Sequence, residues 1–267
     1  MRHELAQLHT AWRDTAQRER VLIALVIAVG YVMLAIPHNQ FGWVVLVLGL
    51  ILSYVRLPRQ TWIYYAMIAV SLGVVYLTPF SVGNSIPNIF VSLFVLMAAL
   101  AIPYVGSHCL FKHSLVHFRL SFRGWSRLEL ITFAGSVGIT ITFLAVYFLM
   151  GDAYKHWQFA TPYDIVVAFI LIMLIGMWEE FYFIASVFGV LKKFLPVFVA
   201  AVLQALMFSA FLYQFGFQGW IVPFTFMYAL AQSLTFYRFR NLALNVSIHF
   251  CVDLAVFILL FVRYQVL

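Results

Sequence analysis

Two adjacent carboxylates, Glu179 and Glu180, lie near the middle of an apolar run, residues 163–191, which is long enough to cross a bilayer as a helix. An ionisable side chain at that depth costs at least about 2.5 kcal/mol unless it faces a polar interior. Adjacent carboxylates in a low-dielectric setting cannot both ionise easily, and a pair that shares a proton suits a general base or a proton carrier. The pair is therefore the first candidate for chemistry.

The last apolar run, residues 242–262, carries a polar stripe of its own. Asn245, His249 and Asp253 are spaced i, i+4, i+8, so they share one face of a helix. Such a face must meet protein or water because lipid cannot satisfy its polar groups. At 1.5 Å per residue, His249, Asp253 and Glu180 lie at a similar depth, roughly 14–20 Å from the nearest basic residues on their helices. We expect the two sets to meet, and Gln204 falls near the same layer.

The composition excludes an ordinary soluble protein. Hydrophobic residues make up 65% and charged residues 9%, with a mean hydropathy of +1.00, whereas soluble proteins have about 25% charged residues. The net charge of +7 is spread in small groups between apolar runs, which indicates membrane topology and not a nucleic-acid partner. We expect a cytoplasmic amphipathic tail at 1–20 and a single membrane domain at 21–267, with the lipid bilayer as a partner.

Nine apolar runs predict an all-α polytopic bundle of about eight or nine spans. The runs cover residues 21–37, 41–55, 61–80, 88–105, 130–150, 163–191, 196–215, 218–236 and 242–262. The first two are short for full spans, so a re-entrant pair is the alternative for them. With nine spans, 14 of the 16 Lys and Arg residues fall on one side, so the N-terminus is expected in the cytoplasm.

The histidine-rich segment 107–126 is a possible metal site on spacing alone. His113 and His117 are i, i+4, and His108 and Cys109 lie nearby. The segment lacks further carboxylate or thiolate ligands, and a cationic amphipathic segment on anionic lipid explains it more simply. Two glutamates and one histidine also make a poor zinc set. We therefore expect neither a metal nor another cofactor.

The spacing of the polar groups resembles a known family. Glu179 and Glu180 in one span, Phe208 in the next, and His249-x-x-x-Asp253 in the last resemble the CAAX-protease and bacteriocin-processing (CPBP, or Abi) family of intramembrane glutamic proteases. The motifs of that family are EExxxR, FxxxH and HxxxN or HxxxD. Its helical core corresponds to about residues 160–262.

The resemblance implies a role for each matched residue. Glu179 would activate a water molecule to attack the scissile carbonyl, and Glu180 would support it. His249 and Asp253 would face the developing oxyanion. A base and a pair of groups that stabilise the oxyanion are what amide hydrolysis without a metal needs. An ionised Asp253 would repel an oxyanion, so this residue either donates in its protonated form or orients His249.

Two positions depart from the family motifs. Ile184 stands where EExxxR has arginine, and Leu212 stands where FxxxH has the histidine that helps to hold the water. Gln204 and Tyr182 are the candidates to replace that histidine. The supporting residues predicted for the site are Asn245, Gln204 and Phe208.

The sequence thus favours an intramembrane endopeptidase that cleaves a peptide or protein terminus near the cytoplasmic leaflet, in a bacterial plasma membrane. Two alternatives stay open. A catalytically lapsed protein of the same fold would act in immunity, binding or scaffolding, and the two missing motif residues favour it. A proton-coupled transporter would use the same carboxylates as a relay, but the sequence has no pair of Gly/Pro-broken helices in matching halves.

Overall fold

The computed structural model describes residues 14–36, 39–78, 86–112, 118–150 and 161–266. Within these ranges the chain is helical, apart from short connections and one isolated bridge between Arg119 and Asn241. The prediction of an all-α membrane protein is confirmed.

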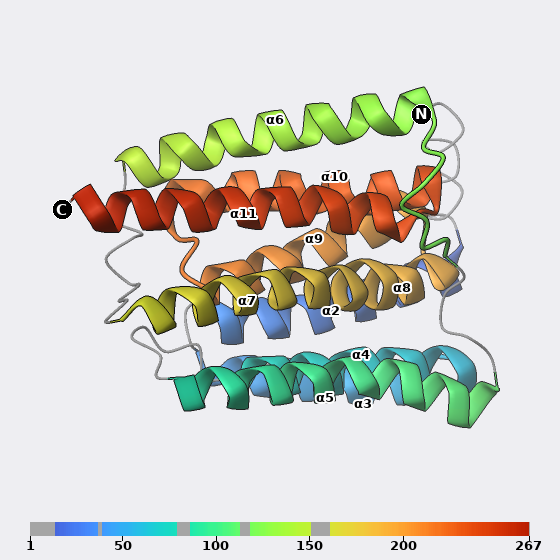
Figure 1. Ribbon diagram of the computed structural model, residues 1–267. Coiled ribbons are helices and arrows are strands. Elements are labelled where there is room, and N and C mark those ends of the chain that lie inside the picture. Colours follow the sequence, from blue (N-terminus) through green and yellow to red (C-terminus); the bar gives the residue numbers. More distant parts are fainter. Residues whose placement is uncertain (1–13, 37–38, 79–85, 113–117, 151–160, 267) are drawn as a thin grey trace.

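The helices follow the apolar runs of the sequence closely (Figure 1). The sixth run forms three consecutive helical segments, and every other run forms one main helix. In chain order the elements are α2 (Thr15–Ala35), α3 (Phe41–Arg56), α4 (Arg59–Tyr76), α5 (Ile86–Phe111), α6 (Arg127–Met150), α7 (Pro162–Glu179), the π-helix η2 (Glu180–Phe188), α8 (Gly189–Phe194), α9 (Val197–Gln214), the 3₁₀ turn η3 (Gly219–Ile221), α10 (Val222–Phe239) and α11 (Leu242–Val266).

Helix α2 begins inside the region expected as a tail. Asp14 is its N-cap, and the carboxylate accepts a hydrogen bond from the Ala16 amide at 3.0 Å. Residues 15–20 therefore form the first turns of α2. The rest of the expected amphipathic tail, residues 1–13, lies outside the described residues.

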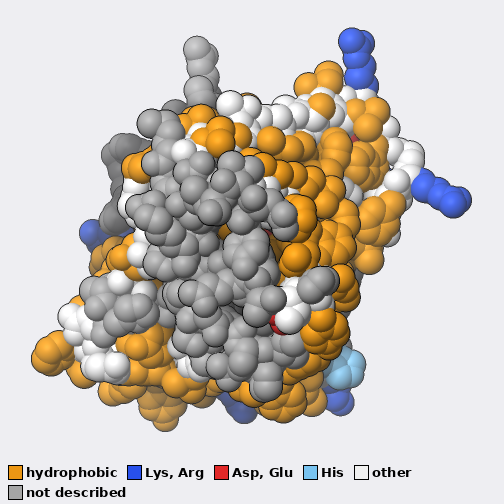
Figure 2. All heavy atoms as spheres, turned by 60° about the vertical axis from the view of Figure 1, so that its left-hand side comes forward, with side chains coloured by type: hydrophobic (Ala, Val, Ile, Leu, Met, Phe, Trp, Pro, Cys, Tyr) orange, Lys and Arg blue, Asp and Glu red, His pale blue; other side chains and the backbone are white. Residues whose placement is uncertain are grey.

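Five of the described helices are long and apolar enough to cross a membrane. They cover Phe90–Phe111, Arg127–Leu149, Tyr163–Phe194, Val197–Gln214 and Leu242–Val262. Helix α3 is apolar but shorter, so the predicted count of eight or nine spans goes beyond these five. Figure 2 shows that hydrophobic side chains cover most of the described surface on one face. Lipid is the natural solvent for such a surface.

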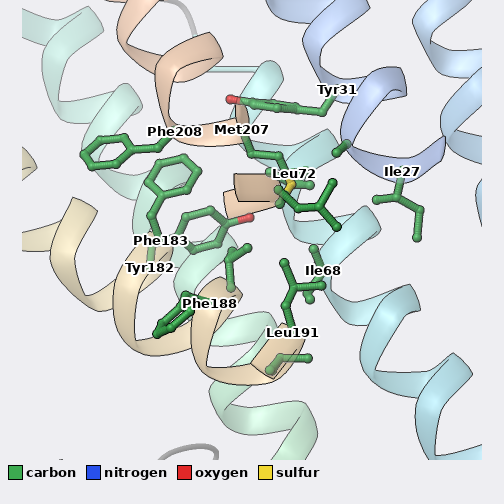
Figure 3. Packing of buried hydrophobic residues seen from close by; sticks show 14 of the residues in the cluster. Ile27, Tyr31, Ile68, Leu72, Tyr182, Phe183, Phe188, Leu191, Met207 and Phe208 are labelled. Carbon is green, nitrogen blue, oxygen red and sulfur yellow. The ribbon is translucent and has the colours of Figure 1, made fainter. Parts of the chain in front are cut away.

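The N-terminal helices share a hydrophobic core with the π-helix. Helices α2 and α4 pack around η2 and α9 in one continuous hydrophobic core. The Tyr182 and Ser71 hydroxyls are hydrogen-bonded at 2.8 Å, and the Trp178 indole donates to the Leu96 carbonyl at 2.7 Å. Figure 3 shows the centre of this core, with Ile27 and Tyr31 of α2, Ile68 and Leu72 of α4, Tyr182, Phe183 and Phe188 of η2, and Met207 and Phe208 of α9.

The segment expected to lie on the lipid surface, residues 107–126, docks on the protein at its C-terminal part. Helix α5 runs through its first residues to Phe111, and residues 113–117, with two of its histidines, lie outside the described ranges. Farther along, the Arg119 amide donates to the Arg240 carbonyl, and the Leu242 amide donates to the Arg119 carbonyl, each at 2.9 Å. These two backbone hydrogen bonds hold the segment against the first residue of α11.

Helix α11 lies between α6 and α7 and packs against both (Figure 1). Helices α9 and α10 also pack together, and α10 contacts α6, η2 and α11. The site is enclosed by these five helices and η2. We call the end of the bundle that carries Lys192, Lys193, Arg238 and Arg240 the basic end.

Candidate active site

The two glutamates lie where the helix of the sixth run changes its geometry. Helix α7 starts with a capping box, in which the Thr161 hydroxyl accepts from the Asp164 amide and the Asp164 carboxylate accepts from the Thr161 amide. It ends at Glu179, and the π-helix begins at Glu180. Wider turns of this kind are rare and often mark functional sites. Here the change of geometry accompanies two adjacent carboxylates that reach the same imidazole.

His249 of α11 lies between the two glutamates. Its Nδ1 is 2.8 Å from Glu180 Oε1, and its Nε2 is 3.2 Å from Glu179 Oε2. Asp253, one turn along the same helix, places Oδ1 3.6 Å from Nε2. The Glu179, Glu180 and His249 side chains are at most 5% exposed. The structure thus brings together the four residues that the sequence placed in one layer.

The charge of this cluster restricts its chemistry. An imidazole can donate from both nitrogens only in its cationic form, and here both nitrogens face carboxylates. Three carboxyl groups around a single imidazole cannot all be ionised at low cost in a buried setting. The cluster therefore holds protons in common, and the His249 imidazole is the group that lies between the two glutamates.

A second layer of amides holds Glu180. The Asn245 side-chain amide donates to the Gln232 main-chain carbonyl at 2.9 Å and to Gln232 Oε1 at 3.0 Å. Gln232 Nε2 in turn lies 2.8 Å from the Tyr228 hydroxyl and 3.4 Å from Glu180 Oε1. Asn245 therefore acts through Gln232 and does not touch the carboxylates directly.

Sequence reasoning missed Tyr228 and Gln232, although a signal was present. Thr225, Tyr228 and Gln232 are spaced i, i+3, i+7 in the eighth apolar run, so they form a polar stripe on one face of α10. The same argument that singled out the stripe on the last helix applies to them.

The two candidates to replace the missing histidine lie elsewhere. Gln204 is fully buried, and its Oε1 accepts a hydrogen bond from the Ser233 hydroxyl. The Tyr182 hydroxyl is bonded to Ser71 on α4, on the N-terminal side of the core. Neither side chain lines the cavity beside the glutamates. Phe208, by contrast, stacks on Phe183, and its ring centre lies 6.2 Å from that of His249.

A cavity of about 60 Å³ lies against the glutamate cluster. A water molecule needs roughly 10–15 Å³ on this measure, so the space suits a few waters or one small group. Most of the wall is apolar or aromatic. It is lined by Thr140, Leu144, Ile172, Ile175, Gly176, Glu179, Leu212, Phe215, Phe217, Phe224, Thr225, Tyr228, His249, Val252, Asp253 and Val256.

The cavity extends away from the basic end. On α7 its lining begins at Ile172 and ends at Glu179, which is about 10 Å of helix on the side opposite the lysines of α8. At the other limit it reaches Phe215 and Phe217, in the connection that follows α9. The space thus occupies the half of the bundle between the glutamates and that connection.

Gly176 allows α7 and α11 to come together at this layer. A Cβ at this position would collide with Asp253 Oδ2 and would lie 3.1 Å from His249 Cδ2. Because Gly176 is one turn before the glutamates, the missing side chain is what lets both polar residues of α11 reach them.

Within the described part of the chain, no group of three or more His, Cys, Asp and Glu side chains has an arrangement that could hold a metal ion. Cys109 of the histidine-rich segment is exposed. His113 and His117 belong to the residues that are not described.

Comparison with known families gave a match over part of the chain. Residues 159–255 match the family described as Rce1-like, type II CAAX prenyl endopeptidase Rce1-like. This segment of the chain is similar to that family. The sequence-based recognition of a CAAX-protease-type family is thereby confirmed. No curated protein and no solved structure matched the chain.

The Rce1-like segment contains the whole cluster and both departures from the motifs. Leu212 lines the cavity, so the position of the motif histidine does face the site and presents an apolar side chain there. Ile184, at the position of the motif arginine, is fully buried in the core and does not line the cavity. The two departures therefore differ in kind, because only Leu212 changes the wall of the site.

Proposed function

We propose that this protein is an intramembrane glutamic endopeptidase. The observation that carries the proposal is the contact between Glu179 and His249, 3.2 Å apart at the wall of a small cavity, with Asp253 beside them. The Rce1-like match supports a protease of the CAAX type. A carboxylate base and an imidazole at one cavity wall are the groups that amide hydrolysis without a bound metal requires.

The proposed reaction gives each member of the cluster a role. Glu179 takes a proton from a water molecule in the cavity, and the water oxygen attacks the scissile carbonyl carbon. His249 donates its Nε2 hydrogen to the oxyanion, while Glu180 holds the opposite nitrogen at 2.8 Å. When the C–N bond breaks, the proton on Glu179 passes to the departing amine. Asp253 orients His249 from 3.6 Å and does not need to face the oxyanion as an anion.

The cavity supports an approach that differs from the one expected from sequence. Depth along the helix suggested cleavage near the cytoplasmic leaflet. The cavity instead lies in the half of the bundle away from the basic end, between Glu179 and Phe217. We propose that the scissile bond enters from that half. By the positive-inside rule the basic end is cytoplasmic, so the substrate would be a membrane peptide approaching from the opposite leaflet.

The number of spans and the side of the membrane on which the N-terminus lies are part of the same proposal. Nine spans with a cytoplasmic N-terminus agree with the basic end, where Lys192 and Arg240 mark two connections on one side. A location in a bacterial plasma membrane stays a prediction.

The test is cleavage by the purified protein in liposomes. The probe is a library of synthetic transmembrane peptides with small and apolar residues at their termini, and cleavage is read by mass spectrometry. Glu179→Gln keeps the volume of the side chain and removes the base, so we expect a rate at least about 10²-fold lower. Glu19→Gln is the matched control, because Glu19 lies outside the site and forms an exposed ion pair with Arg56. No cleavage by the wild type, or equal rates for Glu179→Gln, would refute the proposal.

A catalytically lapsed binding protein is the second candidate, and one observation favours it. Leu212 replaces a polar group on the cavity wall. This candidate predicts that Glu179→Gln leaves binding of a membrane peptide unchanged and that no peptide is cut. Proton-coupled transport by the same carboxylates also stays a prediction, and proton-dependent flux that is lost in Glu180→Gln would support it.

A further inference from the structure

The cavity has a polar side chain that the family motifs do not include. Tyr228 of α10 lines it together with Leu212, Glu179 and His249. The Tyr228 ring meets the imidazole of His249 edge-on, with the ring centres 5.9 Å apart. A phenol therefore shares the wall on which the motif histidine is replaced by leucine.

The hydrogen bonds around Tyr228 fix the direction of its hydroxyl. The main-chain carbonyl of Gln232 can only accept, so the group of Asn245 that lies 2.9 Å away must be its NH₂. The second hydrogen of that NH₂ goes to the Gln232 side chain at 3.0 Å, which must therefore present its oxygen. The NH₂ of Gln232 then faces the Tyr228 hydroxyl at 2.8 Å.

It follows that the Tyr228 oxygen accepts a hydrogen bond and keeps its own hydrogen. A phenol hydroxyl has a single donor hydrogen. Within the described residues no hydrogen bond donated by the Tyr228 hydroxyl is found, and Tyr228 lines the cavity. The amide chain from Asn245 through Gln232 thus prepares a neutral donor on a residue that lines the same cavity as Glu179, in a site where a further anion would be costly.

We propose that Tyr228 is a further catalytic residue, which replaces the missing motif histidine in holding the nucleophilic water. This inference rests on the proposed hydrolysis. The phenol hydrogen is donated to one lone pair of the water oxygen, the water donates one hydrogen to Glu179, and its second lone pair attacks the carbonyl carbon. No bond to Tyr228 is made or broken. A donor fixed in this way is worth about 10²-fold in rate, as other positioned groups are.

A purely structural role for the hydroxyl makes a different prediction. If the phenol only satisfied the Gln232 amide, its loss would lower stability and would not be corrected by a new group on another helix. If it holds the water, a histidine at 212, where the motif has one, should take over the task. Recovery of the cleavage rate by a histidine at 212 therefore separates a structural role of the Tyr228 hydroxyl from a role in holding the water.

The experiment compares Tyr228→Phe, Leu212→His and the double variant in the liposome cleavage assay with the same peptide library. We expect Tyr228→Phe to lower kcat by about 10²-fold and to leave KM within about threefold. The double variant should regain at least about 10-fold in kcat. Tyr213→Phe is the control, because Tyr213 is on α9 and does not line the cavity.

The outcomes distinguish the two proposals. If the wild type cleaves, Glu179→Gln does not, and Tyr228→Phe matches the wild type, only the role of Tyr228 is overturned. A loss in Tyr228→Phe that comes with a lowered melting temperature and is not regained with His at 212 also overturns it. If the wild type cleaves no peptide, both proposals fall. Where Leu212→His does not fold, the kcat and KM of Tyr228→Phe at unchanged melting temperature decide.

Discussion

Replacement of Gly176 by alanine should damage both the stability and the activity of the protein. The added methyl group has no free space, because its carbon would overlap Asp253 Oδ2 and approach the His249 ring to 3.1 Å. A side chain that points at a packed helix forces either a rotamer change or a shift of the backbone. Here both obstacles are polar groups of the proposed catalytic cluster.

The expected size of the effect follows from this geometry. Overpacking by one methyl group typically costs about 1–3 kcal/mol. For a domain of 150–250 residues, 1 kcal/mol shifts the melting temperature by roughly 2–4 °C, so we expect a decrease of about 2–12 °C. A movement of α11 by about an ångström relative to α7 would relieve the overlap, and a displacement of that size lowers a catalysed rate by about 10²-fold.

The assay is thermal unfolding in a mild detergent, followed by tryptophan fluorescence, together with the liposome cleavage assay. Gly138→Ala is the matched control, because a Cβ at Gly138 on α6 would meet no atom within 4 Å. It should leave the melting temperature and the rate unchanged or slightly raise the former. A Gly176→Ala protein that melts and cleaves like Gly138→Ala would refute the close approach of α7 and α11.

The remaining predictions concern buried polar contacts outside the cavity. Tyr182→Phe removes the hydroxyl bonded to Ser71 at 2.8 Å, so the free energy of unfolding should fall by about 1–3 kcal/mol with the cleavage rate unchanged. A role of Tyr182 in holding water would instead appear as a rate loss at constant stability. Glu129→Gln places an NH₂ where a carboxylate oxygen accepts two hydrogen bonds, since Oε1 accepts from Arg119 at 2.9 Å and Asn241 at 3.2 Å, and Oε2 accepts from the Ser126 amide at 2.8 Å and the Ser126 hydroxyl at 2.9 Å. We expect it to cost about 1–3 kcal/mol in unfolding, and a melting curve like that of the wild type would contradict this assignment.

The sequence determined the helices and the partners of the glutamates. Apolar runs separated by polar connections predict membrane helices because lipid cannot satisfy the backbone polar groups. For the same reason a charged or amide side chain inside such a run must face the interior, which is why Glu179, Glu180, His249 and Asp253 could be grouped by depth alone. Depth is set by the rise per residue of a helix, and the depth argument needs no knowledge of helix packing.

Only the tertiary structure decided what surrounds that cluster. Gln204 lies in a suitable layer yet faces Ser233, and Tyr182 faces Ser71, because the rotation of a helix about its axis depends on its neighbours. Tyr228 faces the cavity for the same reason. The side of the membrane toward which the cavity extends also depends on packing. The sequence fixes how deep a residue lies along its helix, but the direction in which a side chain points is settled when helices distant in the chain pack together.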